Sequence, residues 1–263
     1  MLSCCETYKK GENEMKIKKT AIVIILALLA IILLQNKVLA TETRERTTIL
    51  DLTTSDFANN QSNDEEGWKW EAATNTLTLT NVNFNTVDSG CIKIPINKNI
   101  NLVLNGENKL SSTGIYATIT RPSSSTVGTA LIITGTGKLE INSNNTAPTI
   151  DANNLILKSG TINAIGGSIN ALESIKIEGG KVTVNTSSAS IWNDGLYACG
   201  SIEISAGIVE TNVTSVGLFA TGTGAINPTT GIKITGGKIN LSADVAGIYA
   251  GLDNPKDVYI NTT

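Results

Sequence analysis

A recurring four-residue phrase carries the aromatic side chains with which this chain would bind a ligand. Each copy has a small residue, an aliphatic residue, a variable residue and then alanine. Copies occupy residues 114–117, 149–152, 168–171, 195–198, 217–220 and 247–250. The variable position is aromatic at Tyr116, Tyr197, Phe219 and Tyr249, and Trp192 lies just upstream of a copy. Exposed rings bind the apolar faces of sugars, or they stack on one another and stiffen a fold, and the pattern leaves both interpretations open.

The remaining residues argue against catalysis. The chain contains no histidine, which excludes an imidazole base, a His-liganded metal and a Ser-His-Asp triad. Glycoside hydrolysis needs two neighbouring carboxylates, whereas Asp88, Asp151, Asp194 and Asp244 fall singly in separate repeats. A lyase acting on uronic polymers needs a basic Arg or Lys, and Arg121 precedes a proline in an expected loop. We predict no catalytic residues.

Cofactors and nucleic acids are not predicted either. An isolated loop Asp can hold calcium with the help of backbone carbonyls. Asp194, before Gly195, is the weak candidate for such a site, and a solvated turn residue is the alternative. The formal net charge is −3 and no basic run lies outside the N-terminus, so the clustered phosphate contacts of a nucleic-acid binder are not expected.

Two further phrases recur in a constant order with the first one. An apolar-variable-apolar phrase appears at residues 77–79, 102–104, 131–133, 155–157, 175–177, 202–204, 232–234 and 258–260. Glycines follow most copies, and a second alternating phrase then appears, as at residues 139–141, 182–184 and 239–241. Period-two alternation of β-branched residues indicates strands with one buried face, and the glycines indicate corners between them.

Three strands in a fixed order predict an all-β protein, a right-handed parallel β-helix. We expect about eight coils of about 26 residues, with three short strands per coil, over residues 77–263. The alanines of the four-residue phrase would then form one interior file, and the variable residues would point outward. A leucine-rich repeat would need a helical return instead of two further strands. A β-sandwich would not explain three phrases in constant order.

The outward positions of the apolar-variable-apolar phrase predict two further surface features. Lys176, Glu203 and Lys233 alternate in sign on adjacent coils and should form cross-strand ion pairs. Val103, Ile132 and Ile156 would form an apolar outer stripe. Either the N-terminal segment or the loop at residues 118–129 covers this stripe, or a partner does.

The two ends of the repeat region differ from its middle. Residues 41–76 are polar and out of frame, and they are expected to cap the first coil, because an open end exposes core and unpaired backbone. Trp68 and Trp70 would form this cap, with an exposed sugar-stacking pair as the alternative. Residues 258–260 begin a new coil just before Thr263, so we expect that the chain is truncated or that another domain follows.

The N-terminus has the pattern of an export signal. Lys16, Lys18 and Lys19 precede the apolar run at residues 21–34, and cleavage is expected after the small residue Ala40. This predicts a signal peptide at residues 15–40, with an uncleaved anchor as the alternative. Residues 1–14 are expected to be a translated upstream extension. Cleavage would leave Cys91 and Cys199 in an oxidising compartment, where we expect two buried small apolar side chains and not a disulfide.

The motifs at residues 67–81, 175–184 and 247–250 together resemble a known group of proteins. They are Gly-Trp-x-Trp with Leu-Thr-Leu-Thr-Asn, then Ile-x-Ile-x-Gly-Gly followed by alternating apolar residues, then Gly-Ile-Tyr-Ala. This succession resembles secreted right-handed β-helix proteins of Gram-positive gut and soil bacteria. It is also similar to the clostridial carbohydrate-binding domain family, which has the pectate-lyase-like superfold. The resemblance covers about residues 65–263.

The resemblance implies non-catalytic attachment to plant or cell-surface polysaccharide, in some members through calcium beside Asp-Gly-Ile turns. Residues 194–196 are the single turn of that type here. We therefore expect a secreted or cell-surface adhesive module that binds a polysaccharide or cell-wall glycan and does not contact the membrane after signal cleavage. A spacer without a ligand site is the alternative function, and a polysaccharide lyase or hydrolase is the third.

Overall fold

The computed structural model describes residues 45–87, 90–95, 97–122, 128–145, 147–187, 193–223, 230–251 and 257–261. All of them belong to one compact unit, Arg44–Thr263. The predicted extension and signal peptide, residues 1–14 and 15–40, lie outside the described residues. Within the described ranges, no helix is both long enough and apolar enough to cross a membrane.

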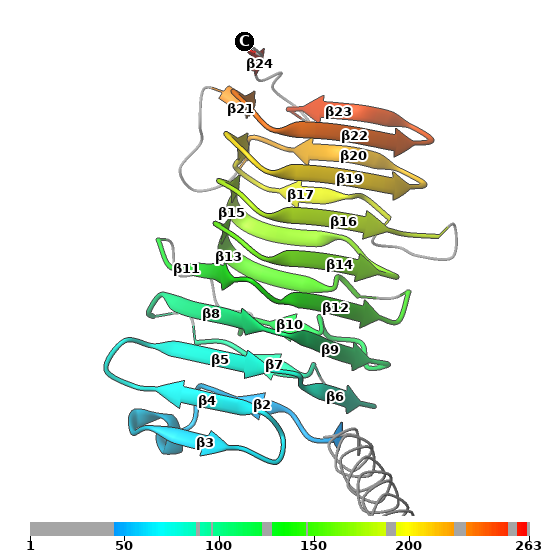
Figure 1. Cartoon of the computed structure of the whole chain (residues 1–263). Helices are drawn as coiled ribbons and strands as arrows, with labels where there is room; N and C mark the ends of the chain where they lie inside the picture. Colours follow the sequence, from blue (N-terminus) through cyan, green and yellow to red (C-terminus); the bar gives the residue numbers. More distant parts are fainter. Residues whose placement is uncertain are drawn as a thin grey trace, which may run out of the picture. The chain divides into compact units, whose positions relative to one another are not determined.

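The described residues form an all-β solenoid of two hydrogen-bonded sheets, with one 3₁₀ turn, η1 (Ser55–Ala58). The first sheet holds the second phrase of each coil, and all its described pairings are parallel. Its strands, in spatial order, are β1 (Glu45–Arg46), β6 (Asn83–Thr86), β9 (Glu107–Ser112), β12 (Lys138–Ser143), β14 (Thr161–Ile165), β16 (Lys181–Asn185), β19 (Ile208–Val213) and β22 (Lys238–Ala243). Figure 1 shows these strands stacked in chain order.

The second sheet contains two columns of strands. The column of the apolar-variable-apolar phrase has β5 (Thr76–Thr80), β8 (Ile100–Asn105), β11 (Ala130–Gly135), the ends of β13 (Ile150–Leu157) and β15 (Ile169–Ile177), β18 (Ser201–Ile204), β21 (Thr230–Ile234) and β24 (Asp257–Ile260). The column of the four-residue phrase, called here the third column, has β2 (Leu50–Asp51), β7 (Ile92–Lys93), β10 (Ile119–Thr120), the starts of β13 and β15, β17 (Leu196–Ala198), β20 (Val216–Ala220) and β23 (Ala246–Ala250).

The parallel β-helix predicted from the three phrases is confirmed, although the solenoid has about six turns and not eight. The described chain begins with β1 and β2, which pair in parallel with β6 and β7. Two antiparallel pairings then follow, in which β4 (Trp68–Glu71) lies between β3 (Gln61–Asn63) and β5. In addition, β13 and β15 each join two predicted strands in one, with a register irregularity between Ala152 and Asn154.

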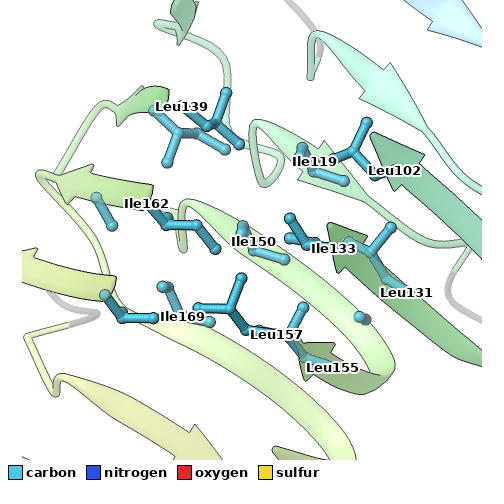
Figure 2. Close-up of a cluster of buried hydrophobic side chains, with 14 of the residues drawn as sticks. Leu102, Ile119, Leu131, Ile133, Leu139, Ile150, Leu155, Leu157, Ile162 and Ile169 are labelled. Atoms are coloured by element: carbon cyan, nitrogen blue, oxygen red, sulfur yellow. The ribbon is translucent and has the colours of Figure 1, made fainter. Parts of the chain in front are cut away.

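Aliphatic side chains fill the interior in files that follow the strand register. Ile150, Ile169 and Leu196 are neighbours in the third column, and all three are fully buried. Figure 2 shows Ile119, Ile133, Ile150, Leu157 and Ile169 pointing toward one another from successive coils. The predicted alanine file is present as Ala152, Ala171, Ala198, Ala220 and Ala250.

The prediction was wrong for the first copy of the four-residue phrase. Residues 114–117 do not form a strand, and Ile119 takes the place beside Ile150 and Ile92 that was expected for Ile115. The reason is burial, because Ile119 is 1% exposed whereas Ile115 is 73% exposed. Ala117 is buried, but it lies outside the alanine file.

A second correction concerns the register of the apolar-variable-apolar phrase. Leu131 pairs with Ile100, two residues before the expected Leu102, whose neighbour is Ile133. Both alignments keep apolar residues inside, because a shift by two preserves the face of a strand. Ile132 therefore lies beside Ile156 as predicted, but beside Asn101 and not Val103, so the apolar outer stripe is interrupted.

The N-terminal cap buries both indoles, as expected for a cap and not for an exposed sugar-stacking pair. Trp70 is fully buried and donates a hydrogen bond from Nε1 to the Phe57 carbonyl at 2.9 Å. Trp68 is 9% exposed and donates to Glu66, which also pairs with Arg46 at 2.6 Å. The ring of Phe57 lies about 6 Å from both indoles.

The predicted ion-pair row on the outer face is also confirmed. Lys176 and Lys233 lie 3.4 and 3.5 Å from Glu203, which sits between them in register.

At the corner between the two sheets, Gly207 has φ +86°, and a Cβ there would lie 2.8 Å from backbone atoms of Gly179 and Gly180. This corner therefore requires glycine both for its left-handed backbone and for the close stacking of coils.

Candidate functional site

The outward side chains of the third column form a row whose chemistry changes along the solenoid. Asp151, Asn170, Tyr197, Phe219 and Tyr249 are successive neighbours in the parallel register. Toward the cap, the same row continues through outward residues of β10, β7 and β2. One part is thus polar and charged, and the other part is aromatic. Parallel stacking holds successive side chains about 4.8 Å apart.

The three aromatic residues contact one another edge to face. The ring centroids of Tyr197 and Phe219 are 5.3 Å apart, and those of Phe219 and Tyr249 are 5.4 Å apart, both with planes at 89°. Perpendicular neighbours do not form one continuous flat platform. Phe219 contacts a ring on each side, which is the arrangement expected where the rings stack on one another. Tyr197, the aromatic residue that lies next to Asn170 in the row, is also part of a groove.

This groove, called here the third-column groove, has a volume of about 900 Å³ and covers the polar part of the row. Its floor is the outer face of β7, β10, β13, β15 and β17, and the segment that precedes β10 contributes a wall. Tyr116, on that segment, is 56% exposed and faces the same groove as Tyr197. The lining residues that matter for binding are Lys93, Tyr116, Thr120, Arg121, Asp151, Asn170, Tyr197 and Cys199.

Two ion pairs organise the charges of the groove. Arg121 Nε donates to Asp151 Oδ1 at 3.3 Å, and the side chain of Arg121 is only 14% exposed. Lys93 pairs with Asp51 at 3.1 Å on the neighbouring strand. Burial opposes ionisation of Asp51, but hydrogen bonds from Thr53 and the contact with Lys93 lower its pKa. Each cation in the described lining therefore has a carboxylate partner.

Burial changes the titration of the groove residues. It raises the pKa of Asp151 above the usual value for aspartate, although the charge of Arg121 opposes the shift. It also raises the pKa of Tyr197 to about 12, together with the nearby Cys199 and Asp194. Tyr197 is therefore a neutral phenol in any physiological solution, able to donate or accept a hydrogen bond.

Amide and thiol groups complete the polar surface. Asn170 is 6% exposed, and its Oδ1 accepts a hydrogen bond from Ser168 Oγ at 2.7 Å. The thiol of Cys199 donates to the Tyr197 oxygen at 3.9 Å. Cys199 is free and half-buried, so the expected burial is found only for Cys91. Burial raises the pKa of the Cys91 thiol to about 11.

Of the predicted ligand-binding residues, Tyr197, Phe219 and Tyr249 are consecutive in the row, and Tyr116 faces the groove from outside the row. Trp192 lies outside the described residues. Sequence reasoning missed Arg121 and Lys93 as groove residues. It placed Asp151 and Asn170 in the outward column without assigning them to a site. Arg121 follows Ile119 by two residues and occurs once, so it gave no periodic signal in a segment whose strand register was predicted wrongly.

The structure places Asp194 at a contact between two coils. Its Oδ1 accepts a hydrogen bond from the backbone N–H of Val216 at 3.1 Å, which ties two coils together. Among the residues with described positions, no group of three or more Cys, Asp or Glu side chains gathers in a way that would hold a metal ion.

The groove has the length and the chemical groups that a hydroxyl-rich chain along the solenoid axis would need. From Lys93 to Tyr197 the row covers four coil steps, which corresponds to about 19 Å. Asp151 and Asn170 offer acceptors, Arg121 and Asn170 offer donors, and Tyr116 and Tyr197 offer apolar ring surface. This combination of planar polar groups and aromatic rings suits sugar rings, which are polar at their edges and apolar on their faces.

Comparison with known proteins supports the same class of ligand. A family model described as "Carbohydrate-binding domain-containing protein" matches residues 69–257. No curated protein and no solved structure matches the chain. Because the matched segment contains most of the chain and nearly all of the solenoid, the protein belongs to this family of carbohydrate-binding domain-containing proteins.

Proposed function

We propose that the protein is an exported, non-catalytic module that attaches to a polysaccharide through the third-column groove. The observation that carries this proposal is the position of Tyr116 and Tyr197 beside Asp151, Arg121 and Asn170 in a single groove of about 900 Å³. A volume of this size exceeds that needed by one sugar ring and lies within the range of ligand sites. The family match supports carbohydrate as the ligand class.

Export is proposed from the sequence alone. Lysines at positions 16, 18 and 19 precede the apolar run at residues 21–34, as in a secretory signal. An exported module of this kind would meet cell-wall glycans or external polysaccharides. Peptide mass spectrometry of the protein from culture supernatant tests the proposal, because a mature N-terminus at residue 41 is expected.

The binding proposal is tested by affinity electrophoresis of the solenoid in gels that contain defined polysaccharides. The Tyr116→Ala and Tyr197→Ala variants should bind the retained polysaccharide about tenfold more weakly, since one lost ring contact corresponds to about 1.4 kcal/mol. Tyr259→Ala is the matched control, because Tyr259 is 48% exposed and lies in β24, outside the groove. Melting temperatures of all variants separate lost binding from lost folding.

The outcomes distinguish the proposed functions. Retention that depends on Tyr116 and Tyr197 but not on Tyr259 supports the groove. Retention that is equal in all variants would place the ligand elsewhere, and lack of retention on every polysaccharide would favour a spacer. Release of reducing sugar or of unsaturated product from a polysaccharide would contradict a non-catalytic role.

A further inference from the structure

We infer that the third-column groove selects uncharged glycans and discriminates against uronic or sulfated ones, and that the Arg121–Asp151 pair sets this preference. The inference rests on the proposed function, because it concerns the ligand class of the same groove. It follows from the way in which the charges in the groove are already paired.

Both cations in the described lining are held by carboxylates. Arg121 lies 3.3 Å from Asp151, and Lys93 lies 3.1 Å from Asp51. An anionic sugar would bind to Arg121 only by displacing Asp151 or by approaching a carboxylate. With a side chain 28% exposed, Asp151 would then remain half-buried without its partner. Removing one member of such a pair is costly, because the other charge stays desolvated.

Several carboxylates lie near Tyr197 and Cys199, which line the groove together. Burial raises the pKa of the Cys199 thiol, the nearby carboxylates of Glu173 and Asp151 act in the same direction, and Tyr197 and Arg121 oppose the shift. Asp194 likewise acts to raise the pKa of Tyr197. A carboxylate or sulfate placed beside Tyr197 would therefore meet repulsion from several acids, whereas a hydroxyl group would find acceptors there.

An uncharged glycan can bind beside the Arg121–Asp151 ion pair without separating its two members. Sugar hydroxyl groups donate to carboxylate oxygens and accept from guanidinium N–H groups, so they can contact an ion pair from the solvent side. Asn170 adds an amide next to Asp151 in the row. The apolar ring faces then rest on Tyr116 or Tyr197, which border the same space.

The test compares neutral and anionic polysaccharides at neutral pH and low salt. Gels contain mixed-linkage β-glucan, xylan or mannan as neutral probes, and polygalacturonate or dextran sulfate as anionic probes. The wild-type protein should be retained by at least one neutral probe at a concentration about tenfold lower than by either anionic probe. Tighter retention by an anionic probe would overturn the charge inference and leave the proposed binding function intact.

The matched variants are Asp151→Asn and Glu203→Gln. Each removes one negative charge beside a cation, but Glu203 lies between Lys176 and Lys233, in a different column of strands from the groove. Asp151→Asn should increase binding to dextran sulfate about tenfold by releasing Arg121, whereas Glu203→Gln should leave it unchanged. An equal gain in both variants, or no gain in Asp151→Asn with unchanged melting, would overturn the role of the pair.

A failure of the proposed binding function gives a different result from a failure of the charge inference alone. If no probe retains the wild-type protein, the groove is not a glycan site and both proposals fall. If neutral probes retain it but Tyr116→Ala and Tyr197→Ala are retained equally, glycans bind elsewhere and the pair does not control their selection.

Discussion

Asp151 shows that one residue at the outward position of a repeat determines which chemical group that coil presents. In the register it lies between Thr120 and Asn170, and its ion-pair partner is Arg121, which directly follows β10. The same position two coils later is Tyr197, and beyond it are Phe219 and Tyr249. Because the backbone is the same at each level, the outward side chain alone decides whether a coil offers charge or an aromatic ring.

The raised pKa of Asp151 predicts a pH-dependent change in charge at the groove. As the pH falls, Asp151 takes up a proton at a higher pH than an ordinary aspartate, because its ionised form is disfavoured by burial. Arg121 then loses its partner, and binding to dextran sulfate, whose sulfate groups stay ionised, should rise. The measurement is the retention of the wild-type protein at a series of pH values.

The control for this prediction is Asp151→Asn, in which the step attributed to Asp151 should be missing. General protonation of surface acids contributes equally to the variant and to the wild-type protein, so the difference between the two curves isolates one carboxyl group. Parallel curves over the whole range would contradict the prediction.

At the scale of strands, the alternating phrases were sufficient to place most of the ladder. The alignment of residues 155–157 with 175–177, 202–204 and 232–234 is that of the structure, because the last three phrases have apolar residues on one face only and all four have apolar residues at both inward positions. The two errors have one cause. Shifts by two or four residues keep the same strand face inward, so alternation alone does not distinguish Ile115 from Ile119 or Leu102 from Ile100.

The repeated phrases did not predict the contacts between residues far apart in the sequence. Arg121 reaches Asp151 over 30 positions, from a segment with no periodic signal. The groove itself depends on where residues 113–118 lie, and this is decided by the burial of Ala117 and Ile119 against other coils. The aromatic members of the row were predictable because they recur, whereas the polar members of the site occur once each.

The glycine corner gives a prediction at this scale. Gly207→Ala should lower the free energy of unfolding by more than about 2 kcal/mol, because it combines a left-handed backbone with contact between coils. Gly128→Ala is the matched control, since Gly128 has φ +96° but nothing within 4 Å of an added Cβ. Urea denaturation of both variants measures the difference. Equal destabilisation would mean that backbone conformation alone matters.

At the scale of the whole solenoid, stability depends on neighbours along one axis. Each coil contacts the coils before and after it, so a terminal coil lacks half of its partners unless another structure covers it. Trp68, Trp70 and Phe57 provide this cover at the N-terminal end. Two tryptophans at alternate positions were a sufficient sequence signal for the cap, but the antiparallel direction of β4 was not predictable from them.

Removing the central cap residue should destabilise the solenoid as a whole. Trp70→Ala deletes a fully buried indole and its hydrogen bond to Phe57, and we expect a loss of about 3–5 kcal/mol. Circular dichroism during urea denaturation measures the loss, with the exposed Tyr259→Ala as the control. A decrease below about 1 kcal/mol would show that the first coil is stable without its cap.

The segment at residues 114–116 has a consequence for how binding preference can diversify in this architecture. It projects two exposed side chains, Ile115 and Tyr116, while Ile119 immediately afterwards restores the stacking on both sides. Substitutions at Ile115 and Tyr116 would therefore change the wall of the groove, while the buried Ala117 and Ile119 hold the segment in place. This part of the groove wall can vary without changing the residues that stack the coils, so mutation can explore one while selection preserves the other.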